Sequence, residues 1–95
     1  MVDKPKLKPS DYVRKGWCQG TMARDAQGKY CPEYSSDAIA WCVYGAVYVT
    51  YSEDQLRRER ILDMLQSFHI RLSSWNDDPK RTQAEVIALL ESIGE

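Results

Sequence analysis

The sequence has one histidine, three cysteines and almost no net charge, and each shortage excludes a class of function. Thirteen Lys and Arg residues against 14 Asp and Glu residues give a net charge of −1. The chain as a whole therefore has no attraction to nucleic acid or to acidic lipid. The cysteines are odd in number and form no CxxC pair, which predicts free thiols and a reducing, cytoplasmic compartment.

The same shortage argues against a metal centre and against covalent catalysis. Cys18, Cys31, Cys42 and His69 are the residues that a Cys₃His zinc site would use. No two of them are closer than eleven residues, whereas structural zinc sites bring their ligands in close pairs. His69 is the only ordinary base and lies beside, not on, the apolar face of its predicted helix. We expect no metal, no cofactor and no catalytic residue, and the sequence favours a protein that is not an enzyme.

A long hydrophobic run is also lacking, but one segment is free of charge. Residues 38–51, AIAWCVYGAVYVTY, contain no charged side chain, and the rest of the chain carries every Asp, Glu, Lys and Arg. This run is shorter than the roughly 20 residues that span a bilayer, so we expect no membrane segment. The N-terminus, MVDKPKLKPS, lacks the apolar region of a signal peptide. The uncharged run is therefore predicted to be the centre of the fold.

Two structures fit the uncharged run. The Val, Tyr and Thr residues of 43–51 favour a strand, but glycine and alanine interrupt the alternation. Ser35, Ser36 and Asp37 precede the run and suit a helix start, which favours a central helix over about 36–51. Such a helix places small residues on one stripe, where another helix is expected to approach closely, and aromatic residues on another. The aromatic stripe consists of Trp41, Tyr44, Tyr48 and Tyr51.

The remaining sequence predicts a mainly α, compact three- to four-helix domain over residues 10–95, preceded by a flexible tail, 1–9. Ser10 is predicted to cap a short helix, 11–15, and residues 17–34 to form an ordered loop or small β-hairpin around a turn at 25–28. Capping boxes at 52–55 and 82–85 predict helices from there to about 73 and 93.

Several short motifs occur in a recognisable order. They are Trp17-Cys18-Gln19-Gly20, Ala23-Arg24-Asp25 with Gly28, Ala38 followed by Trp41-Cys42 and Gly45-Ala46, and Trp75-Asn76-Asp77 with Thr82 and Glu85-Val86. This succession, over about residues 12–93, resembles an uncharacterised family of small bacterial and phage domains of unknown function. The resemblance implies a central helix but no reaction. The chain departs from the family where leucines are usual, at Val47, Tyr48 and Val49, and its first helix is shorter.

Four polar residues next to predicted turns are the candidates for a ligand site. They are Arg24, Asp25, Asn76 and Asp77. The alternative is structural, because Asp and Asn at such places bond the backbone locally. We further predict that Arg24 and Asp77 form an ion pair that clamps the loop onto the last helix–helix corner. Arg57, Arg58 and Arg60 are surrounded by acidic residues, which is typical of a solvated helix face and makes nucleic acid an improbable partner.

The aromatic stripe is the candidate interface. Trp41, Tyr44, Tyr48 and Tyr51 are core if helices cover the central helix on all sides, and interface if only two neighbours cover it. The sequence favours a small non-enzymatic binding domain with a protein partner or a homo-oligomer. A phage-type inhibitor of a host machine fits this size and charge. The alternative is a ligand-binding or enzymatic domain that uses the four polar candidates.

Overall fold

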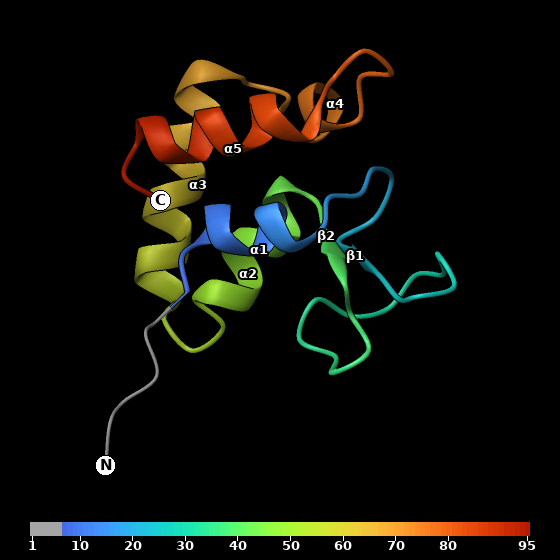
Figure 1. Ribbon diagram of the computed structural model, residues 1–95. Helices are drawn as coiled ribbons and strands as arrows, with labels where there is room; N and C mark the ends of the chain where they lie inside the picture. The colour runs from blue at the N-terminus through green and yellow to red at the C-terminus, as the bar shows by residue number, and fades with distance from the viewer. Residues whose placement is uncertain (1–6) are drawn as a thin grey trace.

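The computed structural model describes residues 7–95, and within them it contains five helices and one two-stranded antiparallel pair (Figure 1). In chain order the elements are α1 (Pro9–Lys15), β1 (Ala23–Arg24), β2 (Ala40–Trp41), α2 (Val43–Thr50), α3 (Gln55–Phe68), α4 (Leu72–Asn76) and α5 (Gln83–Ser92). The predicted class, mainly α with a small β element, is confirmed. Most of the predicted flexible tail lies outside the described residues, but Pro9 already belongs to α1.

The helices enclose one core. Figure 1 shows α1 between α5 and α2, and α1 packs against both of them. On its other sides α2 packs against α3 and α4. The largest fully buried apolar side chains come from all five helices: Val13, Val43, Val47, Leu65, Leu72, Val86 and Leu90. None of the helices within residues 7–95 combines the length and the apolar character that a membrane-spanning segment requires.

The central helix is shorter than predicted. A helix over 36–51 is wrong at its start, because α2 begins at Val43 and its N-cap is Cys42, whose Sγ accepts a hydrogen bond from the Gly45 amide at 3.3 Å. The preceding residues pair with distant backbone instead. The Ile39 amide donates to the Arg24 carbonyl at 2.9 Å, and the Trp41 amide donates to the Gly16 carbonyl at 3.0 Å. Tertiary pairing therefore takes this segment from the helix.

Small residues on α2 do allow a close approach, but the neighbour is not a helix. A Cβ atom built on Gly45 would lie 2.0 Å from the Met22 carbonyl oxygen. The same oxygen accepts a hydrogen bond from the Cys42 amide at 3.1 Å. The predicted contact with a neighbouring helix is corrected to a contact with the backbone of the 17–22 loop.

The loop around residue 25 has the predicted turn. The Gly28 amide donates to the Asp25 carbonyl at 2.9 Å, and Gly28 has a φ of +78°, which suits glycine. The strand that pairs with β1, however, is β2, with Ala23 opposite Trp41. Residues 25–39 therefore form the connection between the two strands. In Figure 1 this connection projects from the lower right of the molecule, away from the helices.

The predicted helix ends are partly right. The capping box at 82–85 is confirmed, because the Glu85 amide donates to Thr82 Oγ1 at 3.2 Å and the Thr82 amide donates to Glu85 Oε1 at 3.0 Å. The box at 52–55 is wrong, since Asp54 caps α3. The helix predicted to end at 73 is broken after Phe68, and α4 follows. The predicted cap Ser10 is also wrong, because α1 begins at Pro9 and its N-cap is Lys8.

Candidate functional site

The buried side-chain amide of Asn76 lies where the 17–22 loop, α2 and α4 meet. Asn76 is 1% exposed. Its Oδ1 accepts hydrogen bonds from Trp17 Nε1 and from the Val43 amide, both at 3.0 Å. Its Nδ2 donates to the Cys18 carbonyl at 3.2 Å and to Asp77 Oδ1 at 2.9 Å. Every hydrogen-bonding position of the side chain is thus filled by the protein, which makes Asn76 a structural group.

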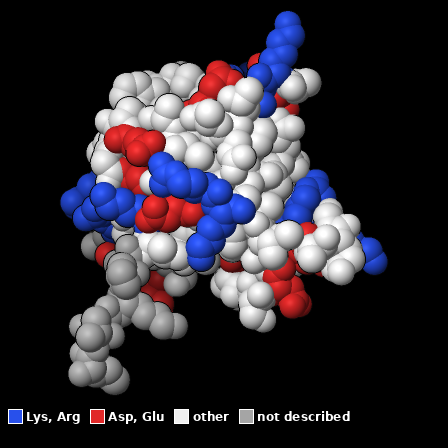
Figure 2. Space-filling model, viewed as in Figure 1, with Lys and Arg blue, Asp and Glu red and all other residues white. Residues whose placement is uncertain are grey.

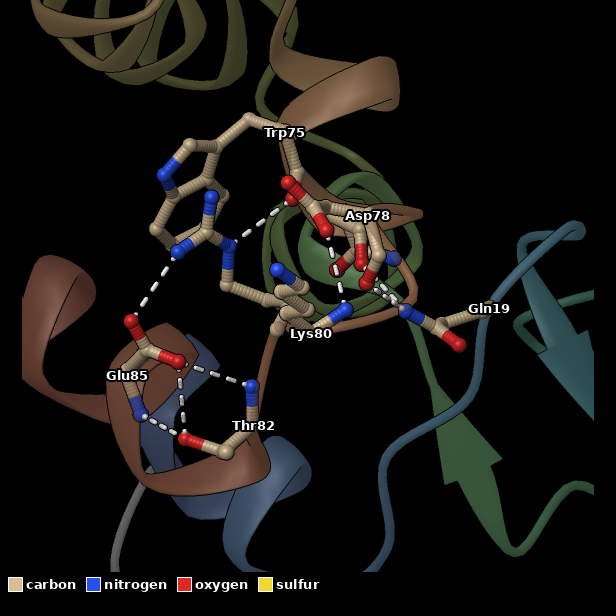
Figure 3. Close-up of polar contacts among 8 residues, drawn as sticks. Gln19, Trp75, Asp78, Lys80, Thr82 and Glu85 are labelled. Atoms are coloured by element: carbon tan, nitrogen blue, oxygen red, sulfur yellow. Dashed lines mark hydrogen bonds and ion pairs between the residues drawn. The ribbon is translucent and has the colours of Figure 1, made fainter.

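The neighbouring residues bind the loop to the corner between α4 and α5. Gln19 Nε2 donates to the carbonyls of Asn76 and Asp78, at 3.0 and 2.8 Å. Figure 3 shows Gln19 reaching from the loop to this corner. The Gly20 amide donates to Asp77 Oδ1 at 3.0 Å. Gln19 and Gly20 therefore hold the 17–22 loop on the corner through their bonds to Asn76, Asp77 and Asp78.

The predicted ion pair between Arg24 and Asp77 is wrong. Arg24 donates from Nη1 to the Gly28 carbonyl and from Nη2 to the Gln19 carbonyl, both at 2.9 Å. No ion pair of Asp77 occurs among residues 7–95. Of the two residues, Asp77 alone reaches between the loop and the corner, where it accepts from the Gly20 amide, whereas Arg24 bonds two carbonyls of its own segment. Backbone groups in a tight loop lie nearer to these side chains than the opposite charge does.

Asp25 is also occupied by the loop. Its Oδ1 accepts hydrogen bonds from the amides of Gln27 and Lys29, at 2.9 and 3.0 Å. This is the local bonding by which an Asp side chain stabilises a turn. Of the four ligand candidates, Arg24 and Asp25 therefore serve the turn, and only Asn76 and Asp77 reach a cavity.

That cavity has a volume of about 440 Å³ and lies between the loop, the start of α2 and α4. Its lining residues are Gly20, Thr21, Met22, Cys42, Tyr44, Ser73, Asn76 and Asp77. Its size falls in the range of small-molecule pockets, about 300–1,000 Å³. Among residues 7–95, Asp77 is the only carboxylate that lines it, and no Lys or Arg residue of that range does.

The histidine and the cysteines offer no reactive group at this cavity. His69 stacks on Trp75 with ring centroids 4.7 Å apart, which fits the predicted boundary histidine. Cys18, Cys31 and Cys42 are free and buried. Burial raises the pKa of the Cys18 thiol to about 12 and also raises the pKa of Cys42. Thiols of raised pKa are poor nucleophiles at neutral pH. Within residues 7–95 no group of His, Cys, Asp and Glu side chains has the arrangement of a metal site.

The aromatic stripe divides into core and boundary residues. Trp41 and Tyr51 are buried, and each has a polar partner: Trp41 Nε1 donates to the Glu33 carbonyl, and the Tyr51 hydroxyl donates to Glu95. Tyr44 and Tyr48 are half-buried. The Tyr44 hydroxyl accepts a hydrogen bond from Gln66 at 2.6 Å, and the Arg58 guanidinium lies 4.8 Å from the Tyr48 ring. The stripe is not one continuous exposed face.

The large exposed apolar side chains lie elsewhere, and sequence periodicity does not find them. Tyr30, Tyr34 and Ile39 are 66, 74 and 52% exposed, and all three belong to the 25–39 connection. A second group, with Leu56, Phe68 and Ile70, lies on and after α3. The available signal for the first group is two tyrosines in a polar segment that contains a turn and Pro32, where no helix or strand would bury them.

Comparison with known proteins gives a family and nothing closer. Residues 11–94 match the family DUF6197, described as a family of unknown function. No curated protein and no solved structure matches the chain. The match covers every element described above except the first residues of α1. Several residues of the motifs hold the fold: Trp17, Asn76 and Asp77 in the Asn76 network, Arg24 and Asp25 at the 25–28 turn, and Cys42, Thr82 and Glu85 at the helix caps. The chain belongs to DUF6197, a family of unknown function.

Proposed function

We propose that this domain binds another protein without catalysing a reaction, and that residues 25–39, here called the tyrosine loop, form its binding surface. The observation that carries the proposal is the exposure of Tyr30, Tyr34 and Ile39 on one connection. Tyrosine is enriched at protein interfaces, where its ring is buried and its hydroxyl finds a polar partner. A cytoplasmic location fits the three free thiols. The narrower prediction of a phage-type inhibitor rests on size and charge alone.

The backbone of the tyrosine loop is fixed before any partner arrives. The Asp25 amide donates to the Lys29 carbonyl at 2.9 Å, and the Cys31 amide donates to the Ala23 carbonyl at 3.2 Å. The bond from Trp41 Nε1 to the Glu33 carbonyl, 3.0 Å long, ties the middle of the loop to the core. A rigid loop loses little conformational entropy on binding, which favours affinity.

The charge of the loop indicates the chemistry of the partner surface. Residues 25–39 contain three acidic residues and one basic residue, Lys29, which gives a net charge of −2. Figure 2 shows uncharged atoms between separate acidic and basic groups at this end of the molecule. A complementary partner would offer apolar pockets for the tyrosines and a rim rich in Lys and Arg. Association should then slow as ionic strength rises.

The test is site-specific photo-crosslinking in the source cell. A photoreactive phenylalanine at position 34 should crosslink one protein in near-stoichiometric yield. The same group at Leu56, which is equally exposed on α3, should not. With that partner purified, Tyr34→Ser should weaken binding by about thirtyfold, which corresponds to the roughly 2 kcal/mol of an interface hot spot.

A matched control variant is Leu56→Ser, which should leave the affinity unchanged. Crosslinking at position 34 only to a second copy of the chain would contradict the proposal. Equal crosslinking from positions 34 and 56 would also contradict it, because the tyrosine loop would then contact other proteins no more specifically than Leu56 does.

A further inference from the structure

The cavity beside Asp77 contains a carboxylate that the fold positions but does not neutralise. Asp77 Oδ1 accepts hydrogen bonds from the Gly20 amide and from Asn76 Nδ2. These two donors fix the carboxylate at the edge of the cavity. Its second oxygen, Oδ2, has no hydrogen-bond or ion-pair partner among residues 7–95.

The countercharge that the sequence predicts for Asp77 is engaged elsewhere. Arg24 uses Nη1 and Nη2 on two backbone carbonyls, and it does not line the cavity. Four carboxylates of residues 7–95, those of Asp11, Glu85, Glu91 and Glu95, have an arginine within 4.0 Å, whereas Asp77 does not. Asp77 thus combines two features: it lines a cavity, and no cation of the described chain pairs with it.

The other walls of the cavity suit an apolar body. Met22, Cys42 and Tyr44 provide a thioether, a buried thiol and an aromatic ring on the side of the loop and α2. Aromatic rings attract cations through their faces, and an aliphatic or aromatic ligand body packs on all three side chains. Thr21 and Ser73 add hydroxyl groups that can accept a hydrogen bond from an N–H group.

We propose that this cavity binds an organic ammonium group attached to an apolar body, and that Asp77 is the residue that pairs with the ammonium. The site is separate from the tyrosine loop and does not depend on the protein-binding proposal. The same chemistry is carried by a free small amine and by a lysine side chain, and the test separates these two sources.

The test follows backbone amide NMR signals of the whole chain during titration with probes of matched shape. Benzylammonium should shift the amide signals of Gly20, Thr21 and Asp77 in a saturable way. Benzyl alcohol should bind about fivefold more weakly, a ratio that corresponds to about 1 kcal/mol for one exposed charge pair. Benzoate should leave these signals unchanged, because the carboxylates repel each other.

Asp77→Asn isolates the charge. The new amide oxygen still accepts from Gly20 and Asn76, so the variant should fold, but benzylammonium should bind about fivefold more weakly. Asp78→Asn is the matched control. It removes the adjacent carboxylate, which bonds the Lys80 amide outside the cavity, and it should leave the affinity unchanged.

Nα-acetyl-lysine methylamide presents the same ammonium group from a peptide unit. Tighter binding of this probe than of benzylammonium assigns the cavity to a lysine side chain, and weaker binding assigns it to a free amine. The proposal is overturned if benzylammonium leaves the three amide signals unshifted. It is also overturned if benzyl alcohol binds equally well, a comparison that decides even if Asp77→Asn does not fold.

Discussion

At the scale of single residues, Asn76 joins four parts of the protein. It is the only asparagine in the chain, and its one side chain bonds Trp17, Cys18, Val43 and Asp77. The sequence places it correctly beside a turn, next to the end of a helix. It cannot show which long-range groups the amide meets, because those contacts span 33 to 59 positions of the chain.

Asn76→Ala should therefore be far more harmful than its small change in volume suggests. It leaves the indole N–H of Trp17 and the amide of Val43 without their acceptor, and an unsatisfied buried donor costs about 1–3 kcal/mol. We expect a loss of about 3 kcal/mol in the free energy of unfolding by urea. The variant Asp78→Ala, at an exposed position two residues further along the chain, should lose less than about 1 kcal/mol. Equal losses would show that the network does not stabilise the fold.

The buried Cys18 thiol and Tyr51 hydroxyl should make the stability of the fold depend on pH in the alkaline range. Burial raises the pKa of Cys18 from 9.0 to about 12, and burial together with the bond to Glu95 raises the pKa of Tyr51 from 10.0 to about 12. The folded state keeps these protons when the unfolded chain has lost them. Their contribution is therefore complete below pH 9.0 and is lost as the pH rises toward about 12.

The measurement is urea unfolding at increasing pH across this window. The free energy of unfolding should fall, and it should fall less steeply in Tyr51→Phe, which has no proton to lose at that position. Stability that is flat up to about pH 12, or a slope that is the same in both proteins, would contradict the assignment.

At the scale of elements, local signals predict well where the backbone partners are local. Thr82 and Glu85 cap α5 as their spacing predicts, because both groups lie within one turn. The helix predicted for residues 36–42 does not form, because the backbone partners of this segment are distant. Arg24 and Gly16 bond the amides of Ile39 and Trp41, which a helix would use. The cap of α2 is accordingly a cysteine, which no list of favoured caps would select.

Gly45 in α2 provides a sharp test of this arrangement. Intrinsic propensity alone predicts that Gly45→Ala stabilises the helix by about 1 kcal/mol. The Met22 carbonyl oxygen, 2.0 Å from the added Cβ, predicts the opposite, a net loss of about 2 kcal/mol through overpacking. Thermal or urea unfolding decides between the two signs.

Gly28→Ala is the companion variant for Gly45→Ala. A Cβ atom added at Gly28 has no atom within 4 Å, so only the φ of +78° disfavours the substitution. The expected loss in the free energy of unfolding is about 1–2 kcal/mol. A stabilised Gly45→Ala protein would mean that the loop does not sit on α2 as described.

At the scale of the whole molecule, the chain separates residues that hold the fold from residues that the fold does not need. The motifs Trp17–Gly20 and Trp75–Asp77 form hydrogen bonds between the 17–22 loop, α2 and the α4–α5 corner. The sequence predicts the class, the single core and the free thiols from composition and periodicity. It does not predict the exposed surface, because a tyrosine outside a periodic pattern is equally compatible with burial and with exposure.

This separation predicts that the tyrosine loop can be changed without loss of stability. Tyr30 and Tyr34 are 66 and 74% exposed, so the variant Tyr30→Ser/Tyr34→Ser should keep its free energy of unfolding within about 0.5 kcal/mol. Trp41→Phe is the contrasting variant at the base of the same loop. It removes a buried indole N–H that anchors the Glu33 carbonyl and should cost about 1 kcal/mol or more. If the double serine variant were the less stable of the two, the tyrosines would be packing residues of this domain, and the surface that we assign to a partner would instead belong to its own fold.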